Sequence, residues 1–341
     1  MKQTLITLTF CLAFSSLWVG CSKPKNAALP AGNSNTADNG SSQPAANSTA
    51  QANGPAELKL KWEMGKTYTM EMSLNQNSEI DIPDRPQPME QVMKLSEGYH
   101  FLPVKDLDNG GHQVELDFDS EALELSENGR DMINFDSTKN ATIAPNDPAA
   151  PVAAVMRAML GVPLDYTFGA DGLVEKIDGT DALQSRINAA AGPQQRAQMQ
   201  QMFSKDTLKQ YASFGESLPD HPVNIGDTWT VNRDLTTPAG VMTINMTYTF
   251  KDWQQVNGHN CAHMVATGDI ATKAASIAMA GVKVDIQSGT ISGDDWFDPA
   301  LGMMVALNSD QDLTMKITAR GRTMMEKTKQ NIQMSLADMT P

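Results

Sequence analysis

The sequence predicts a mainly β protein with a helical insert, an α+β fold built on an antiparallel meander that is duplicated. Three observations favour it. Apolar and polar side chains alternate as in strands through most of residues 58–335, turn-forming pairs separate these runs, and three short blocks recur in the same order. We expect the two halves to form one curved sheet or two facing sheets.

The first 20 residues have the features of a bacterial export signal. Lys2 precedes an apolar run, from Leu5 to Val19, that is too short to span a bilayer. The stretch from Leu17 to Cys21 resembles the lipobox of bacterial lipoproteins, although Trp18 stands where leucine is usual. The resemblance implies that Cys21 becomes the first mature residue and carries lipid. An ordinary secretory signal that ends near a cysteine is the alternative.

Residues 21–57 are predicted to form a disordered tether behind the lipidated cysteine. They are almost entirely Asn, Ala, Ser, Gly, Pro, Gln and Thr, so they cannot bury enough apolar area to offset the entropy of ordering. In the lipoprotein family, a serine such as Ser22 after the cysteine implies sorting to the outer membrane. We therefore expect a lipid-anchored domain of the cell envelope that faces the periplasm, with the membrane as its partner through Cys21.

The first β half is expected over residues 58–178. The run from Lys66 to Leu74 alternates and includes Thr and Tyr, which is typical of a half-buried strand. Further strand-like runs of this half are Gln113–Glu124 and Leu164–Ile177. Those of the second half are Thr228–Val231, Val241–Phe250, His263–Ile270, Val282–Ile291 and Met303–Thr318. Turn pairs such as Asn128-Gly129 and Asn257-Gly258 separate them, as in hairpins.

Helical periodicity is confined to the middle of the chain. A short amphipathic helix is predicted near 148–161, where apolar residues recur at three- and four-residue spacing and Gly161 ends the pattern. A helical insert is predicted over 179–218 and should be broken at Gly192-Pro193. Such helices would cover one face of a sheet or cap an apolar opening.

The second β half is expected over residues 219–335, followed by a tail at 336–341. Its turns repeat those of the first half in order. The pairs are Gly65–Thr69 with Gly226–Thr230, Asp108–His112 with Val256–His259, and Phe168–Val174 with Phe297–Val305. Three matches in the same order favour a duplication.

Three stretches that overlap these blocks also resemble a known family. They are Lys61–Tyr68, Leu218–Trp229 with its Pro-Val-x-x-Gly-Asp-x-Trp pattern, and the turn Phe297–Gly302. They resemble the recurring blocks of an uncharacterised family of bacterial secreted and lipid-anchored β-proteins of unknown function. The resemblance covers most of residues 58–320 and implies fold and location, but no catalytic residue.

The composition excludes several functional classes. The chain has 26 basic and 40 acidic residues, a net charge of -14, which argues against binding to a phosphate backbone. Of its three cysteines, Cys11 leaves with the signal and Cys21 is the lipid site, so Cys261 has no partner for a disulfide.

One segment raises the possibility of a metal site. His259, Cys261 and His263 recur at every second residue, so an extended chain would place all three on one face, with ligands suited to zinc or copper. The alternative is one surface histidine, one inward cysteine and one packed histidine, and we favour it. We expect no resident metal or cofactor.

Methionine is abundant, with 22 residues, and includes Met156, Met159, Met199 and Met202 on the predicted helices. Most should fill the core. Methionine-rich surfaces also adapt to varied apolar ligands, and thioether clusters select Cu(I).

Acidic residues near Trp296 suggest a hydrolase as a minority hypothesis. Asp294, Asp295 and Asp298 surround this tryptophan, and paired carboxylates beside an aromatic ring can act as acid and base on a sugar. The alternative is a set of solvated turn carboxylates. The chain has no Gly-x-Ser-x-Gly elbow, phosphate loop, dinucleotide fingerprint or His-Glu-x-x-His helix.

Two non-catalytic functions remain from the sequence. The first is a binding protein of the cell envelope that holds an apolar ligand or another envelope component. The second is a structural or assembly module of the envelope. The absence of catalytic motifs favours binding over hydrolysis.

Overall fold

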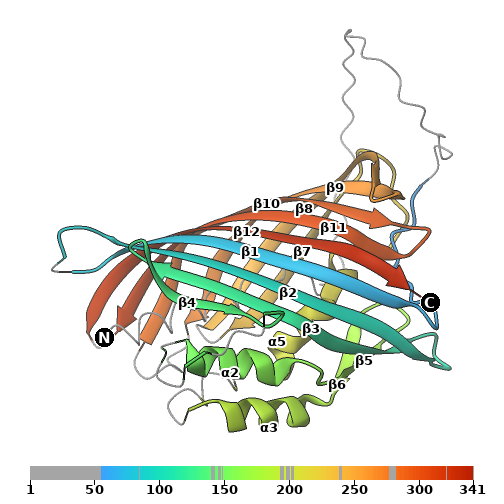
Figure 1. Cartoon of the computed structure of the whole chain (residues 1–341). Helices are drawn as coiled ribbons and strands as arrows, with labels where there is room; N and C mark the ends of the chain where they lie inside the picture. Colours follow the sequence, from blue (N-terminus) through green and yellow to red (C-terminus); the bar gives the residue numbers. More distant parts are fainter. Residues whose placement is uncertain are drawn as a thin grey trace, which may run out of the picture.

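The chain folds around one 12-stranded sheet (Figure 1). The computed structural model describes residues 55–83, 85–139, 143–144, 147, 149–192, 196, 200, 203–237, 240–275, 282–319 and 321–340. Its strands are β1 (Thr67–Asp81), β2 (Met89–Asp106), β3 (His112–Glu127), β4 (Arg130–Asp136), β5 (Leu164–Phe168), β6 (Val174–Asp178), β7 (Thr228–Thr237), β8 (Gly240–Val256), β9 (His259–Ala275), β10 (Val282–Asp298), β11 (Met303–Ala319) and β12 (Arg322–Thr340). The described helices are α2 (Ala150–Met159), α3 (Thr180–Ala190), α5 (Lys205–Lys209) and the 3-10 helix η1 (Gln210–Ser217). The predicted mainly β class is confirmed.

The strand order joins the two ends of the domain. It runs β6-β5-β3-β2-β1-β12-β11-β10-β9-β8-β7, with β4 beside β3, and every registered pair is antiparallel. The first strand thus pairs with the last. The two predicted halves lie in one open sheet rather than in two facing sheets.

Alternation along each strand builds the inner face of the sheet. In β1, every second residue from Tyr68 to Ile80 is buried and the residues between them are exposed or half-buried. The same pattern runs along β2 and β12. Because successive strand side chains point to opposite faces, a single buried face follows from this pattern.

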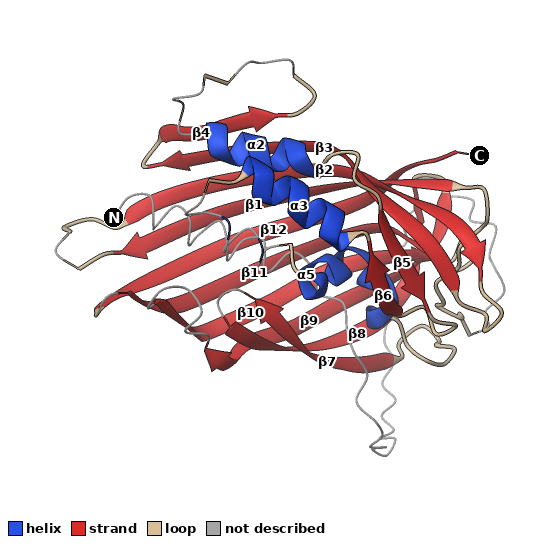
Figure 2. Ribbon diagram, turned by 90° about the horizontal axis from the view of Figure 1, so that it is seen from below, coloured by secondary structure: helices blue, strands red, loops and turns tan. Residues whose placement is uncertain are grey.

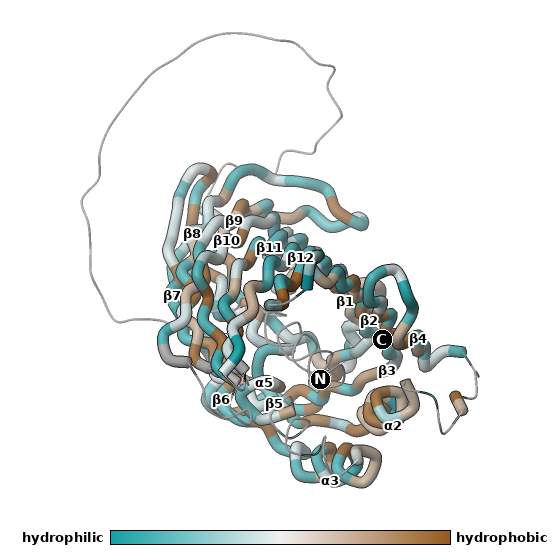
Figure 3. Tube along the Cα trace, turned by 90° about the vertical axis from the view of Figure 1, so that its left-hand side faces the viewer, coloured by the Kyte–Doolittle hydropathy of each residue, from teal (hydrophilic) through white to brown (hydrophobic). Residues whose placement is uncertain are grey.

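The sheet curls strongly around this face (Figures 2 and 3). Its edge strands, β6 and β7, are far apart in strand order, yet both contact α5. On the β5 side the hydroxyl of Tyr166 donates to the carbonyl of Leu208 at 2.6 Å. On the β7 side the indole of Trp229 donates to the carbonyl of Ser217 at 2.9 Å. The segment α5–η1 therefore lies between the two edges.

An extended segment before β1 packs across one end of the curl. Ala56, Leu58, Leu60 and Trp62 are buried and alternate with exposed residues. Ala56 forms a β-bridge with Val223. The folded domain therefore already includes Ala56, one residue before the predicted end of the tether at residue 57. The Trp62 ring lies 5.4, 5.4 and 5.2 Å from the rings of Tyr68, Phe101 and Phe168, respectively. This aromatic cluster seals that end of the inner face.

The helices form within the two ranges that the sequence predicts. In α2, a proline lies in the first turn, as expected for a helix start, and Gly161 follows the end with a φ of 63°. The insert contains α3, α5 and η1. Pro193, Met199 and Met202 lie outside the described residues, as do the predicted signal and Cys21. None of the helices that the structure describes is long and apolar enough to cross a membrane.

Some strands differ from the sequence expectation. Leu164–Ile177, predicted as one run, is the hairpin β5–β6, and β2, β4 and β12 were not among the predicted strands. Each of the three recurring blocks lies at corresponding places in the two halves. The first block comes at the start of β1 and of β7. The second joins β2 to β3 and β8 to β9, and the third joins β5 to β6 and β10 to β11. Their shared placement is compatible with a duplication, which stays a prediction.

Candidate functional site

The strongest candidate site is a cavity between the inner face of the sheet and η1. Ser213, Phe214 and Ser217 of η1 form one wall. The opposite wall consists of Met246, Tyr248, Ala266, Ile291, Gly293, Asp295, Met304, Leu307, Ser309, Gln311, Ile332 and Met334, from five neighbouring strands. The cavity has about 40 Å³ of free volume. That is room for about three or four water molecules, since one needs roughly 10–15 Å³ by the same measure. A larger guest therefore requires η1 to move.

Asp295 is the acidic group of this cavity. It lies on β10 between Met264 of β9 and Leu307 of β11 and is only 5% exposed. Burial, together with the negative charge of Asp294, raises the pKa of Asp295 to about 7. Near neutral pH this carboxyl therefore exists in both forms: the acid can donate a hydrogen bond, and the carboxylate can accept one.

A pair of acidic residues lies on the same inner face, on the strands beyond β1 from the cavity. Glu97 of β2 is directly opposite Glu121 of β3, and both side chains are buried. The hydroxyl of Tyr211 in η1 donates to Oε1 of Glu97 at 3.2 Å. Burial raises the pKa of Glu97 to about 8, although the Tyr211 hydrogen bond lowers it. For Glu121, burial and then the charge of Glu97 raise the pKa well above its usual value. The pair thus retains protons where exposed carboxyls are ionised.

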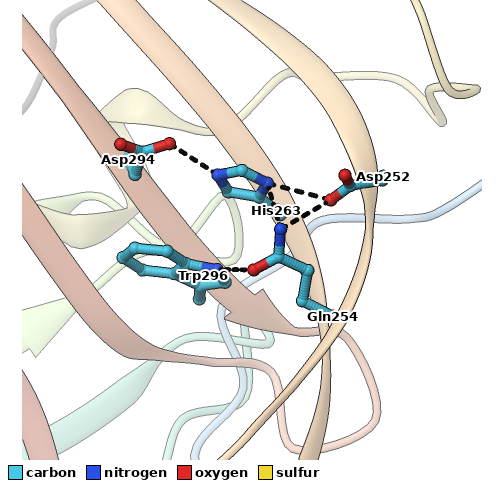
Figure 4. Close-up of polar contacts among 5 residues, drawn as sticks. All are labelled: Asp252, Gln254, His263, Asp294 and Trp296. Atoms are coloured by element: carbon cyan, nitrogen blue, oxygen red, sulfur yellow. Dashed lines mark hydrogen bonds and ion pairs between the residues drawn. The ribbon is translucent and has the colours of Figure 1, made fainter. Parts of the chain in front are cut away.

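A buried histidine holds β8, β9 and β10 together (Figure 4). The His263 Nε2 lies 2.6 Å from Oδ1 of Asp294, and its Nδ1 lies 2.9 Å from Oδ1 of Asp252. Its ring stacks on Trp296 with 5.1 Å between centroids. The Trp296 indole donates to Oε1 of Gln254 at 2.8 Å, which directs the amide nitrogen of Gln254 towards His263 and Asp252.

Both ring nitrogens of His263 have partners that suit a donor or an acceptor. A neutral ring donates from Nε2 to Asp294 and accepts at Nδ1 from Gln254. A charged ring donates from both nitrogens, to Asp294 and Asp252, because ionised carboxylates only accept. The histidine cluster (Asp252, Gln254, His263, Asp294 and Trp296) is therefore a cross-strand clamp with no vacant ring nitrogen for a metal or a substrate.

The structure separates the three carboxylates of the hydrolase hypothesis. Asp294 contacts His263, and Asp295 faces the cavity from the opposite side of β10. Asp298 is the last residue of β10, and its Oδ1 accepts from the backbone N–H of Ala300 in the following turn at 2.8 Å. The three carboxylates are not brought together beside the Trp296 ring, whose face is occupied by His263.

The three residues of the possible metal set also have separate surroundings. Nδ1 of His259 lies 3.0 Å from Asp298 Oδ2, while His263 contacts Asp252 and Asp294. Cys261 is a buried free thiol whose pKa is raised to about 12, first by burial and then by the charge of Asp298. No group of three or more potential ligands suited to a metal ion occurs in the described part of the chain.

Two larger hollows open at the surface. One has about 210 Å³ and lies beside residues 57–60 and 218–222, and the other has about 650 Å³ and lies at the β3–β4 hairpin. Five charged or histidine side chains lie among the leucines and prolines of the first, and mostly polar residues line the second, whereas ligand pockets are mainly apolar with a few polar groups. The cavity under η1 fits that description better despite its small volume.

Sequence reasoning missed Glu97, Glu121 and Gln254. The two glutamates are far apart in the chain, and only the register of β2 and β3 places them opposite each other. Glu97 could have been noticed as an acidic residue among alternating apolar residues in the run Val92–Phe101.

The fold and the site define a class: an open antiparallel sheet, curled around an apolar face, with a helical segment over a small cavity. The chain belongs to a family of unknown function (DUF6263), which matches residues 109–304, more than half of its length. No curated protein matches the chain.

Solved structures offer only weak likenesses. One is lipovitellin, in a structure concerned with lipid–protein interactions, at 10% identity and a TM-score of 0.41, covering 82% of this chain and 26% of the other. This chain thus spans about a quarter of the lipovitellin chain. A Bacteroides fragilis protein with a YmcC-like fold matches at 9% identity and a TM-score of 0.22, covering 83% and 99% of the two chains. DynF of the dynemicin pathway of Micromonospora chersina matches at 6% identity and a TM-score of 0.20, covering 85% of this chain and 92% of the other. With scores below 0.5, none supports a functional argument.

The acidic pair predicts a protein that loses stability as pH rises. The raised pKa values mean that the folded chain holds protons that the unfolded chain releases. Between the ordinary glutamate pKa of 4.5 and the folded value of about 8, the free energy of unfolding should therefore fall with pH. The slope is at most about 1.4 kcal/mol per pH unit for each group. Urea unfolding at pH 5, 6, 7 and 8 measures it.

Glu97→Gln should flatten this pH dependence and make the protein more stable than wild type at pH 8. Glu124→Gln is the matched control, because Glu124 lies on the exposed face of β3 in a surface pair with Lys94. Equal pH profiles for wild type and Glu97→Gln would show that the pair does not hold a buried proton.

The histidine cluster predicts a large loss of stability for His263→Ala. The substitution removes a buried ring that stacks on Trp296 and bonds both carboxylates, and we expect a loss of about 2 to 4 kcal/mol, the scale of truncating a large buried side chain. His221→Ala is the control, because His221 is an exposed partner of Asp220, and such pairs contribute at most about 1 kcal/mol. Similar losses for both variants in urea unfolding would contradict the clamp.

Proposed function

We propose that this protein is a non-catalytic binding protein of the cell envelope that holds an apolar molecule between the inner face of the sheet and η1. The cavity beneath η1 carries the proposal. Its walls are mainly Met, Ile, Leu, Phe and Tyr side chains, with a carboxyl, Asp295, on one side. Apolar walls with a few polar groups are typical of small-molecule sites.

The contacts of η1 suggest how a ligand would enter. The segment is short, and Ala212 and Ser213 within it have non-helical backbone angles. Polar contacts to the sheet hold it in place: Tyr211 with Glu97, Trp229 with the Ser217 carbonyl, and Arg233 with Glu216 at 4.0 Å. Aromatic packing also holds it, since the Tyr211 ring lies 5.2 Å from the Phe118 ring and the Phe214 ring lies 5.7 Å from the Phe101 ring, so entry of a ligand requires these contacts to break. Displacement of η1 would enlarge the cavity along the methionine-rich strands.

We also propose a lipid anchor at Cys21 and a location at the outer membrane, facing the periplasm. Support comes from the sequence: the apolar run before Gly20-Cys21, Ser22 after it, and the polar stretch up to the domain. The anchor would keep the binding domain beside a membrane, where apolar molecules concentrate.

Apolar ligand binding predicts that the purified protein carries or takes up such a molecule. Native mass spectrometry after gentle purification should show a bound mass, and the neutral apolar dye Nile red should gain fluorescence on binding. Ala266→Leu, which adds methyl groups inside the cavity, should weaken dye binding at least tenfold. Ala271→Leu on the exposed face of β9 is the matched control.

Two outcomes would contradict the binding proposal. Repeated empty spectra together with no dye binding would remove its basis. Equal dye affinities for Ala266→Leu and the wild type would place the dye outside the cavity.

The lipid anchor predicts that Cys21→Ala releases the protein from membranes, because the acyl chains that hold it there are attached to that thiol. Fractionation of cells should move the variant from the membrane to the soluble fraction. Cys261→Ala, which changes a buried thiol of the domain, should leave the distribution unchanged. A Cys21→Ala variant that stays equally membrane-bound would refute the anchor.

A further inference from the structure

The inner face carries a buried polar patch where β1 pairs with β12, at positions where apolar residues are expected. Gln76 of β1 pairs in register with Gln330 of β12, and Gln330 pairs with Gln311 of β11. All three glutamines are at most 4% exposed. A second row beside them contains Gln91 of β2, Ser78 of β1 and Thr328 of β12. With Glu326 of β12, these seven residues form what we call the glutamine patch.

Part of the patch is an ordered hydrogen-bond chain. The Thr328 hydroxyl donates to Oε1 of Glu326 at 3.1 Å, and its oxygen lies 2.8 Å from the Ser78 hydroxyl. Since a hydroxyl has only one proton, Ser78 must donate to Thr328. The amide of Gln76 in turn donates to Ser78 at 3.2 Å. The chain therefore runs from Gln76 to Glu326 in one direction.

Other polar atoms of the patch are buried without a partner. Within the described residues, both amide atoms of Gln91 and Oε2 of Glu326 lack a hydrogen bond. Gln91 is 2% exposed and Glu326 is 1% exposed. A buried polar atom left without a partner costs about 1–3 kcal/mol, so such groups call for an explanation. A bound molecule that supplies hydrogen bonds would satisfy both.

The patch adjoins the cavity under η1. Gln311 belongs to the patch and to the cavity wall, where Ser309 is the next inward residue of β11. Along β12 the inward residues change from Thr328 and Gln330 to Ile332 and Met334, which also line the cavity. A polar end and an apolar end of one binding surface therefore meet without interruption.

We propose that the ligand is an amphiphile with an uncharged, hydroxyl-bearing headgroup, such as a monoacylglycerol, whose head contacts the glutamine patch and whose tail lies along the cavity. This inference rests on the proposed function and names its ligand class. Six of the seven patch residues are neutral donors and acceptors, which match hydroxyl groups that both donate and accept. The patch contains no Lys or Arg, so an anionic head would be buried near Glu326 without a compensating charge.

Displacement of Nile red from the purified protein tests the ligand class. The competitors share a 12-carbon chain and differ in the head: 1-monolauroylglycerol is neutral, laurate is anionic and dodecyltrimethylammonium is cationic. We expect the neutral compound to displace the dye at a concentration at least tenfold lower than either charged one. Equal potency, or a stronger effect of a charged compound, would overturn the inference and leave the proposed function standing. Absence of dye binding, with empty native spectra, would refute both.

Gln91→Leu tests the patch itself. It removes the two unpartnered amide atoms and keeps a side chain of similar size. The binding of 1-monolauroylglycerol should therefore weaken at least tenfold, while the affinity for Nile red stays within about twofold of the wild type. Gln333→Leu is the control, because Gln333 lies on the exposed face of β12. An unchanged preference in Gln91→Leu would overturn the role of the patch. If the variant does not fold, the preference of the wild type decides the ligand class.

Discussion

The pairing of β1 with β12 is the constraint on which the rest of the structure depends. It extends from Thr67 opposite Thr340 to Asp81 opposite Met325, and it joins residues more than 240 positions apart. The cysteine in the described part of the chain, Cys261, is a free thiol, so backbone hydrogen bonds and side-chain packing hold this seam. Without the seam the sheet would be two separate halves. The inner face is continuous from one half of the sheet to the other only because β1 pairs with β12.

The inner face combines apolar packing with buried acids and amides at specific places. Glu97 and Asp295 lie towards opposite ends of one cross-strand row, with Met72, Met334 and Leu307 between them. Folding alone would favour apolar residues at all these positions, because burial of a carboxyl disfavours its charged form. Natural chains depart from such rules mostly where they bind or react with something. The same residues therefore explain both the expected pH dependence of stability and the choice of the site.

The period-two signal predicted most of the strands whose inward residues are apolar, although it missed the short β4. It missed β12 because Glu326, Thr328 and Gln330 are polar residues at inward positions, so the alternation disappears from the sequence. In β2, the inward Glu97 and Gln91 had the same effect. The inward polar residues near the candidate site are thus the ones that interrupted the alternation, which is why these strands were not predicted. Helix positions were easier, since Gly161 and the apolar spacing before it are local signals.

By itself, the sequence determined the mainly β class, the place of the helices and many of the turns, because alternation, helical spacing and Asn-Gly pairs act over a few residues. Only the tertiary structure decided which side chains share a site. Asp294 and Asp295 are neighbours in the chain but face opposite sides of β10, one at His263 and the other at the cavity. Gln76 and Gln330 are distant in the chain but adjacent across the seam. The reason is that a strand sends consecutive side chains to opposite faces, whereas the register of pairing between distant strands sets their neighbours.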